Sequence, residues 1–121
     1  VEDTADPLDW SLVSKKGEMR TQHVQLHESN NMQKPDHGVL YGDSVKTIND
    51  AWAIKGDITP ITQGNVNIYI IPKQNAGYAG GFGGQGQNVN NVTIINKSGT
   101  NQIITGFPGS GYTYDLSGLL P

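Results

Sequence analysis

Three runs of β-branched and aromatic residues in the second half of the chain constrain the fold more than any other feature. They occupy residues 66–72, 89–95 and 102–107, and the first of them stops at Pro72. Residues of these types favour strands, and proline ends a strand because it cannot donate to a hydrogen-bonded ladder. The last two runs are joined across Ser-Gly-Thr-Asn at 98–101, which is typical of a turn. We therefore predict a hairpin, and with it an antiparallel sheet.

The first half of the chain indicates helix. Residues 44–55 show the clearest pattern, because apolar residues recur at helical spacing between an N-cap candidate and a closing glycine. The residues of this pattern are Asp43, Ser44, Val45, Ile48, Ala51, Trp52 and Gly56. The segment 18–28 is short enough to be a helix or a strand. This order predicts an α+β fold, with N-terminal helical segments packed on a twisted antiparallel sheet.

A glycine-rich segment, residues 75–86, lies between the first two predicted strands and holds six of the 16 glycines of the chain. We expect this segment to be a mobile loop. Residues 81–86 match the dinucleotide-binding pattern G-x-G-x-x-G, but that pattern must open a helix after a strand. Because a strand is predicted to follow here, nucleotide binding of that kind is not expected.

Charge is unevenly distributed along the chain. The net charge is −3, yet four acids lie in the first nine residues, and from Trp10 onward eight basic and seven acidic residues leave a net of +1. We therefore expect residues 1–17 to be an acidic tether and residues 18–121 to form the domain. A near-neutral domain argues against strong non-specific binding to a polyanion. The longest apolar run is far too short to cross a bilayer, so no membrane span is expected.

All three histidines fall within fifteen positions, at His23, His27 and His37. His23 and His27 are four residues apart and so share one face on either a helix or a strand. Imidazole acts as an acid or a base near neutral pH, which makes this cluster a candidate catalytic site. His-x-x-x-His is also a zinc-ligand spacing, but Val24 replaces the glutamate of a metalloprotease and no third ligand is obvious, so neither a metal nor another cofactor is expected. The alternative is that these are surface histidines or hydrogen-bonded core histidines.

Other chemistries lack the residues that they need. The chain has no cysteine, which excludes a thiol nucleophile and the cysteine pair of a zinc deaminase. Every glutamate lies in the first 28 residues, and Asp115 is the only acid after Asp57. The paired carboxylates of a glycosidase and the late acid of an ADP-ribosyltransferase are therefore not expected. What remains is acid–base catalysis by histidine, helped by hydroxyl, lysine and tyrosine groups.

Four segments of the chain carry a family resemblance. They read Thr-Gln-His-Val-Gln-Leu-His at 21–27, Lys-Pro-Asp-His-Gly-Val-Leu-Tyr at 34–41, Asn-Asp-Ala-Trp at 49–52 and Ile-Ile-Thr-Gly-Phe-Pro at 103–108. Together they resemble the C-terminal toxin domains of bacterial contact-dependent growth inhibition systems and related polymorphic toxins, over about residues 18–110. The resemblance implies either a barnase/EndoU/colicin/RelE-like nuclease fold or the fold of the ribonuclease A-like toxins.

The resemblance also implies a set of site residues. In the ribonuclease A-like toxins the site contains the histidine of a His-Val pair, a following basic residue, and the threonine and aromatic residue of the last strand. By position these are His23, Lys34, Thr105 and Phe107. Phe107 is a departure, because those toxins tend to have a tyrosine there, so the role of its hydroxyl is vacant or is taken by another residue. The barnase/EndoU-like alternative is slightly favoured, since His27 and His37 offer further acid–base groups.

These residue types fit the chemistry of a metal-independent ribonuclease. Such an enzyme needs a base for the ribose 2′-OH proton, an acid for the leaving 5′-oxygen, and donors for the charge that develops on the phosphate. The expected proton carriers are His23, His27 and His37. Lys34 and Thr105 complete the expected catalytic set by stabilising the charge on the phosphate. The expected substrate-binding residues are Arg20, at the phosphate, and Tyr78, against a base.

The resemblance thus implies an antibacterial toxin domain that cleaves tRNA in the cytoplasm of a target cell, delivered there as part of a larger secreted or cell-surface effector. A cognate immunity protein would neutralise it in the producing cell, and a requirement for a host translation factor is left open. DNA, which lacks the 2′-OH, would be a poor substrate. The alternative function is a non-enzymatic, Gly- and Asn-rich β binding module of a bacterial surface protein, which would recognise a glycan or a protein.

Overall fold

The computed structural model describes residues 8–11, 19–30, 32–33, 37–56 and 58–109. Its helical elements are α1 (Arg20–Gln25), the 3₁₀ turn η1 (Leu26–Glu28) and α2 (Ser44–Ala53). Its strands are β1 (His37–Leu40), β2 (Ile61–Gln63), β3 (Val66–Gly80), β4 (Asn88–Lys97) and β5 (Ile103–Pro108). The described side chains do not include those of Arg20, Gln22, His23 and Leu26.

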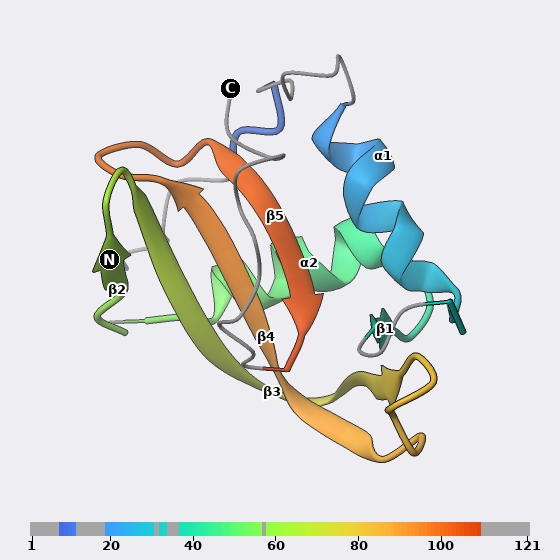
Figure 1. Ribbon diagram of the computed structural model, residues 1–121. Coiled ribbons are helices and arrows are strands. Elements are labelled where there is room, and N and C mark those ends of the chain that lie inside the picture. Colours follow the sequence, from blue (N-terminus) through green and yellow to red (C-terminus); the bar gives the residue numbers. More distant parts are fainter. Residues whose placement is uncertain (1–7, 12–18, 31, 34–36, 57, 110–121) are drawn as a thin grey trace.

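The five strands form one antiparallel sheet in which β3 is central (Figure 1). One edge of β3 carries two short strands: β1 pairs with its C-terminal end, where His37 lies opposite Gly80, and β2 pairs with its N-terminal end. The other edge pairs with β4, which pairs in turn with β5. α2 lies across the sheet and α1 lies beside β5 (Figure 1). The predicted α+β class and the predicted hairpin of the last two strands are confirmed.

The helix α2 forms where the sequence predicts it, because its ends and its apolar face are both encoded locally. The Asp43 side chain accepts a hydrogen bond from the Lys46 backbone N–H at 3.1 Å, which makes it the N-cap. On the exposed face Lys46 pairs with Asp50 at 2.8 Å, and this hydrogen bond lowers the pKa of the Asp50 carboxyl. The opposite face is buried against the sheet through residues that include Ile48 and Trp52.

The expectation of a mobile loop at residues 75–86 is wrong for its first half. β3 continues to Gly80, past an irregularity in its pairing with β4 between Pro72 and Gly77, and only residues 81–87 connect β3 to β4. The glycines serve close packing here. A Cβ atom at Gly77 would overlap the carbonyl of Val39 on β1, and one at Gly80 would lie 2.6 Å from the carbonyl oxygen of His37. Gly77 and Gly80 therefore permit close backbone approach between β3 and β1.

β1 and β2 were not predicted from the sequence. β1 follows a segment that indicates a turn and begins with His37-Gly38, and β2 consists of three exposed residues in a polar stretch. Both are too short to show an alternating pattern, and both exist because β3 offers them a backbone edge. β1 brings His37 into the sheet and therefore matters for the site.

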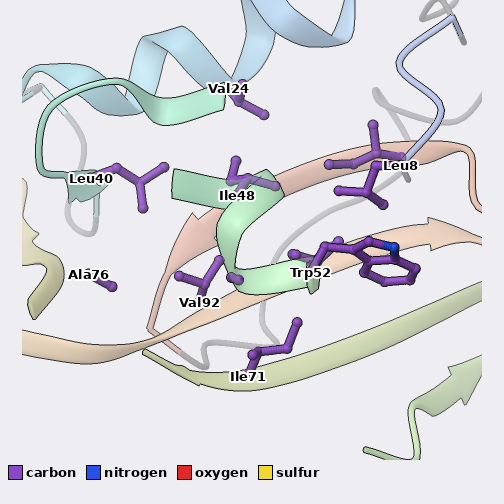
Figure 2. Close-up of a cluster of buried hydrophobic side chains, with 11 residues drawn as sticks. Leu8, Val24, Leu40, Ile48, Trp52, Ile71, Ala76 and Val92 are labelled. Carbon is purple, nitrogen blue, oxygen red and sulfur yellow. The ribbon is translucent and has the colours of Figure 1, made fainter. Parts of the chain in front are cut away.

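Two apolar clusters build the core. The larger one lies between α2 and the sheet, where Ile48 and Trp52 pack with Ile71 and Val92 (Figure 2). Leu8 and Val24 belong to the same cluster and lie at its periphery in this view (Figure 2). The second cluster contains side chains of β3, β4 and β5, namely Val66, Ile68, Ile95, Ile104 and Phe107. Phe107 belongs to this second cluster and also reaches the site described below.

A short N-terminal segment packs on the fold although the sequence places it in a tether. Leu8 is buried in the larger cluster, and the Trp10 indole N–H donates to the Asn49 side-chain oxygen at 3.1 Å. The backbone of Asp9 accepts from the Ile103 N–H at 3.0 Å and donates to the Asn101 carbonyl at 2.8 Å. The other residues of the expected tether lie outside the described part of the chain. None of the helices described above is both long enough and apolar enough to cross a membrane.

Candidate active site

Two of the three histidines meet where η1, β1 and β5 come together. The His27 and His37 rings are stacked, with centroids 4.8 Å apart and planes 13° from parallel. Both are buried, at 7% and 5% exposure. His27 lies in η1, directly after α1, and His37 is the first residue of β1. The structure thus brings together two of the residues that the sequence singled out.

Backbone carbonyls fix the proton position on each ring. His27 Nδ1 lies 2.6 Å from the Gly38 carbonyl oxygen, and His37 Nε2 lies 3.0 Å from the Ser29 carbonyl oxygen. A carbonyl oxygen can only accept, so the nitrogen beside it must carry the proton. In the neutral rings the basic lone pair therefore lies on Nε2 of His27 and on Nδ1 of His37. The two rings are held as opposite tautomers.

The last strand supplies the third side of the site. The Phe107 ring lies 6.2 Å from the His27 ring, centroid to centroid, and is tilted against it. Thr105 is two residues earlier on β5 and so projects from the same face as Phe107. Thr105 is fully buried, and its hydroxyl has no hydrogen-bond partner in the described structure. An unsatisfied buried hydroxyl carries a desolvation cost, and Thr105 shares this condition with the side-chain oxygen of Asn96.

Two side chains that the sequence did not single out hold the connection between the histidines. A Glu28 carboxylate oxygen accepts from the Ser44 N–H at 3.0 Å and from the Ser44 hydroxyl at 2.6 Å, which ties the end of η1 to the start of α2. The Asn30 side-chain oxygen accepts from the Gly81 N–H at 2.7 Å, which ties the same connection to the loop after β3. Neither residue lies in a motif, and both partners are distant in sequence.

The structure describes only part of the other predicted site residues. His23 and Arg20 lie in α1, but their side chains are outside the described part, so the shared face of His23 and His27 stays a prediction. Lys34 lies outside the described residues altogether. Tyr78 lies in β3, opposite Val39 of β1. The described residues contain no group of three or more His, Asp or Glu side chains that could hold a metal ion.

Comparisons with protein-family models, with curated proteins and with solved structures find no match to this chain.

Proposed function

We propose that this chain is a metal-independent endoribonuclease in which His27 and His37 form the acid–base pair. The stacked pair of opposite tautomers is the observation that carries the proposal. The two rings lie 4.8 Å apart, centroid to centroid, and each is held by a backbone carbonyl at a different ring nitrogen. In the proposed reaction one ring of the pair acts as the base and the other as the acid.

In the proposed reaction the ribose 2′-oxygen attacks the adjacent phosphorus. The neutral ring takes the 2′-OH proton, the new bond forms between the 2′-oxygen and phosphorus, and the bond from phosphorus to the 5′-oxygen breaks. The charged ring gives its proton to that 5′-oxygen. The products are a 2′,3′-cyclic phosphate and a free 5′-hydroxyl. Arg20 and Lys34 are assigned to the phosphate, and His23 is a third proton carrier that could replace one member of the pair.

The biological context of the proposal rests on the resemblance over about residues 18–110. The α+β architecture is compatible with a barnase/EndoU/colicin/RelE-like toxin domain. The proposed substrate is tRNA in a target cell, reached by delivery as part of a larger effector. The proposed partner in the producing cell is a cognate immunity protein, and a host translation factor is a second candidate partner.

The test separates proton transfer from the structural role of each histidine. His27→Asn keeps an amide N–H near the position of Nδ1, and His37→Gln keeps one near the position of Nε2, so each retains a donor for its carbonyl. We expect each variant to fold and to cleave RNA roughly 10²–10⁴ times more slowly than the wild type. The wild type should cleave in excess EDTA, leave a 2′,3′-cyclic phosphate and spare a substrate whose scissile nucleotide lacks the 2′-OH.

Two results would reject the proposal. Full cleavage by both variants would show that the pair serves packing alone. The second result is growth arrest without RNA cleavage. If that arrest persists when the histidines are replaced, it favours the alternative, a non-enzymatic binding module.

A further inference from the structure

The outer end of the β3–β4 hairpin lies beside β1 (Figure 1). A second group of side chains belongs to this region. We call it the amide–tyrosine patch, and it consists of Tyr41, Asn75, Tyr78, Asn88 and Asn90. The two tyrosine rings are 5.8 Å apart and tilted by 39°, and Tyr41 is 45% exposed. The three asparagines are exposed. None of the five side chains is charged at neutral pH.

A chain of hydrogen bonds orients every amide in the patch. The Asn75 backbone N–H can only donate, so the side-chain atom of Asn90 that lies 2.9 Å from it must be an oxygen. That oxygen also accepts from Asn88 at 3.0 Å, which fixes Nδ2 of Asn88 as the donor. The same Nδ2 donates to Asn75 Oδ1 at 3.0 Å, and Asn88 Oδ1 accepts from the Tyr41 hydroxyl at 3.2 Å. The network therefore has one consistent arrangement.

This arrangement leaves hydrogen-bond donors on the outside. The oxygens of Asn75 and Asn90 are engaged within the network, whereas their Nδ2 groups have no partner among the described residues. A ligand therefore meets two amide donors next to the exposed ring of Tyr41 and the partly buried ring of Tyr78. Such a surface fits a flat ring with two adjacent acceptors. The N7 and O6 atoms of guanine form such an edge, whereas adenine presents a donor beside N7.

The patch is continuous with the histidine pair through β1. Val39 lies opposite Tyr78 and His37 lies opposite Gly80, so His37 and Tyr78 are diagonal neighbours on one face of the β1–β3 ladder. Diagonal neighbours in an antiparallel pair are about 7–8 Å apart. Tyr41 follows β1 directly, and its N–H donates to the Ala76 carbonyl at 3.1 Å. A nucleobase on the patch would thus lie close to the stacked histidines.

We infer that the amide–tyrosine patch is a subsite for an unpaired guanine next to the scissile phosphate. The inference rests on the proposed ribonuclease function. The base would stack on Tyr41 or Tyr78 and present N7 and O6 to the Nδ2 groups of Asn75 and Asn90. The absence of charge within the patch argues for recognition of a neutral ring rather than of a phosphate. The two outward donors match the two acceptors on the edge of guanine. A sugar hydroxyl both donates and accepts, so any polar group can bind it and a pair of donors is not required.

The test measures binding apart from cleavage. The probe is a fluorescent single-stranded oligodeoxyadenylate with one central guanine, compared with the all-adenine oligomer, because neither has a 2′-OH and neither is cleaved. We expect the wild type to bind the guanine-containing probe roughly tenfold more tightly. Tyr41→Ala should weaken binding roughly 5- to 100-fold, whereas Tyr41→Phe keeps the ring and should retain most of the affinity.

Asn90→Asp tests the donor directly. The carboxylate keeps an inward oxygen for Asn75 and Asn88 and replaces the outward donor by an acceptor, so the preference for guanine should disappear. Asn49→Asp is the matched control, because it adds the same charge on α2 and keeps the oxygen that accepts from Trp10. Asn49→Asp should bind both probes as the wild type does.

The outcomes distinguish the subsite from the catalytic proposal. RNA cleavage with equal binding of both probes would overturn the subsite and leave the ribonuclease intact. Guanine-selective binding without RNA cleavage would support the subsite and reject the ribonuclease. Binding of a glycan with no binding of either oligonucleotide would overturn both.

Discussion

Gly106 of β5 lies directly beneath α2, and this contact permits a quantitative test of the packing. A Cβ atom at Gly106 would lie 2.7 Å from Cδ1 of Ile48, 3.1 Å from its Cγ1 and 3.4 Å from its Cγ2. Ile48 is fully buried, so its end cannot swing into solvent. Gly106→Ala should therefore cost about 1–3 kcal/mol from overpacking, less about 0.5–1 kcal/mol because alanine is the better strand residue.

The compensating variant follows from the same distances. Ile48→Val removes Cδ1, the atom that the new methyl group would strike, and alone it should cost about 1 kcal/mol. In the double variant the two remaining contacts, at 3.1 Å and 3.4 Å, require only a small adjustment. We expect the double variant to be more stable than the sum of the single changes predicts, by about 1–2 kcal/mol.

Urea unfolding of the four proteins measures this coupling, provided that all four have the same m-value. The single variants and the double variant form a complete cycle with the wild type. Free energies that add to within about 0.5 kcal/mol would refute the reasoning, because they would mean that Ile48 does not lie over Gly106.

Two further predictions concern the surroundings of the histidine pair. Thr105→Val should raise the free energy of unfolding by about 1 kcal/mol, since it removes a buried hydroxyl without a partner, and a urea titration that shows destabilisation would contradict this assignment. If that hydroxyl also donates to the phosphate, the same variant should cleave RNA about 10–10³ times more slowly. Glu28→Ala should cost about 1–3 kcal/mol by leaving the buried Ser44 hydroxyl without its acceptor, and Glu28→Gln, which keeps an oxygen there, should cost less. Equal unfolding midpoints for Glu28→Ala and Glu28→Gln would show that this acceptor does not matter.

The parts of the fold that follow from local signals were predictable. α2 has its cap at Asp43 and its apolar stripe within ten residues, and the β4–β5 hairpin has its turn between two strand-like runs. β1 and the far end of β3 have no such signal, because their pairing depends on each other. Glycine content at residues 77–80 indicates flexibility when read alone, whereas the structure uses it to bring two backbones together.

The histidine site was likewise only partly predictable from the sequence. The sequence indicated that the histidines cluster, and spacing suggested His23 and His27 as the natural neighbours. The observed stack joins His27 to His37, which is ten residues away and on a different element. That contact depends on the position of β1 relative to η1, which does not follow from periodicity. Tyr41 and Asn88 are 47 residues apart, so no sequence pattern could pair them.

The hydrogen bonds of Asp9 with Asn101 and Ile103 have a consequence for self-association. β5 is the last strand of the sheet, and an open strand edge can template pairing with a second molecule. The segment around Asp9 occupies one end of that edge with a parallel bridge to Gln102, while α1 lies beside β5. Asp9, which the sequence assigns to a tether, thus covers one end of the open edge of β5. A version of the chain shortened to begin after them would expose backbone groups of β5 and would be prone to aggregate.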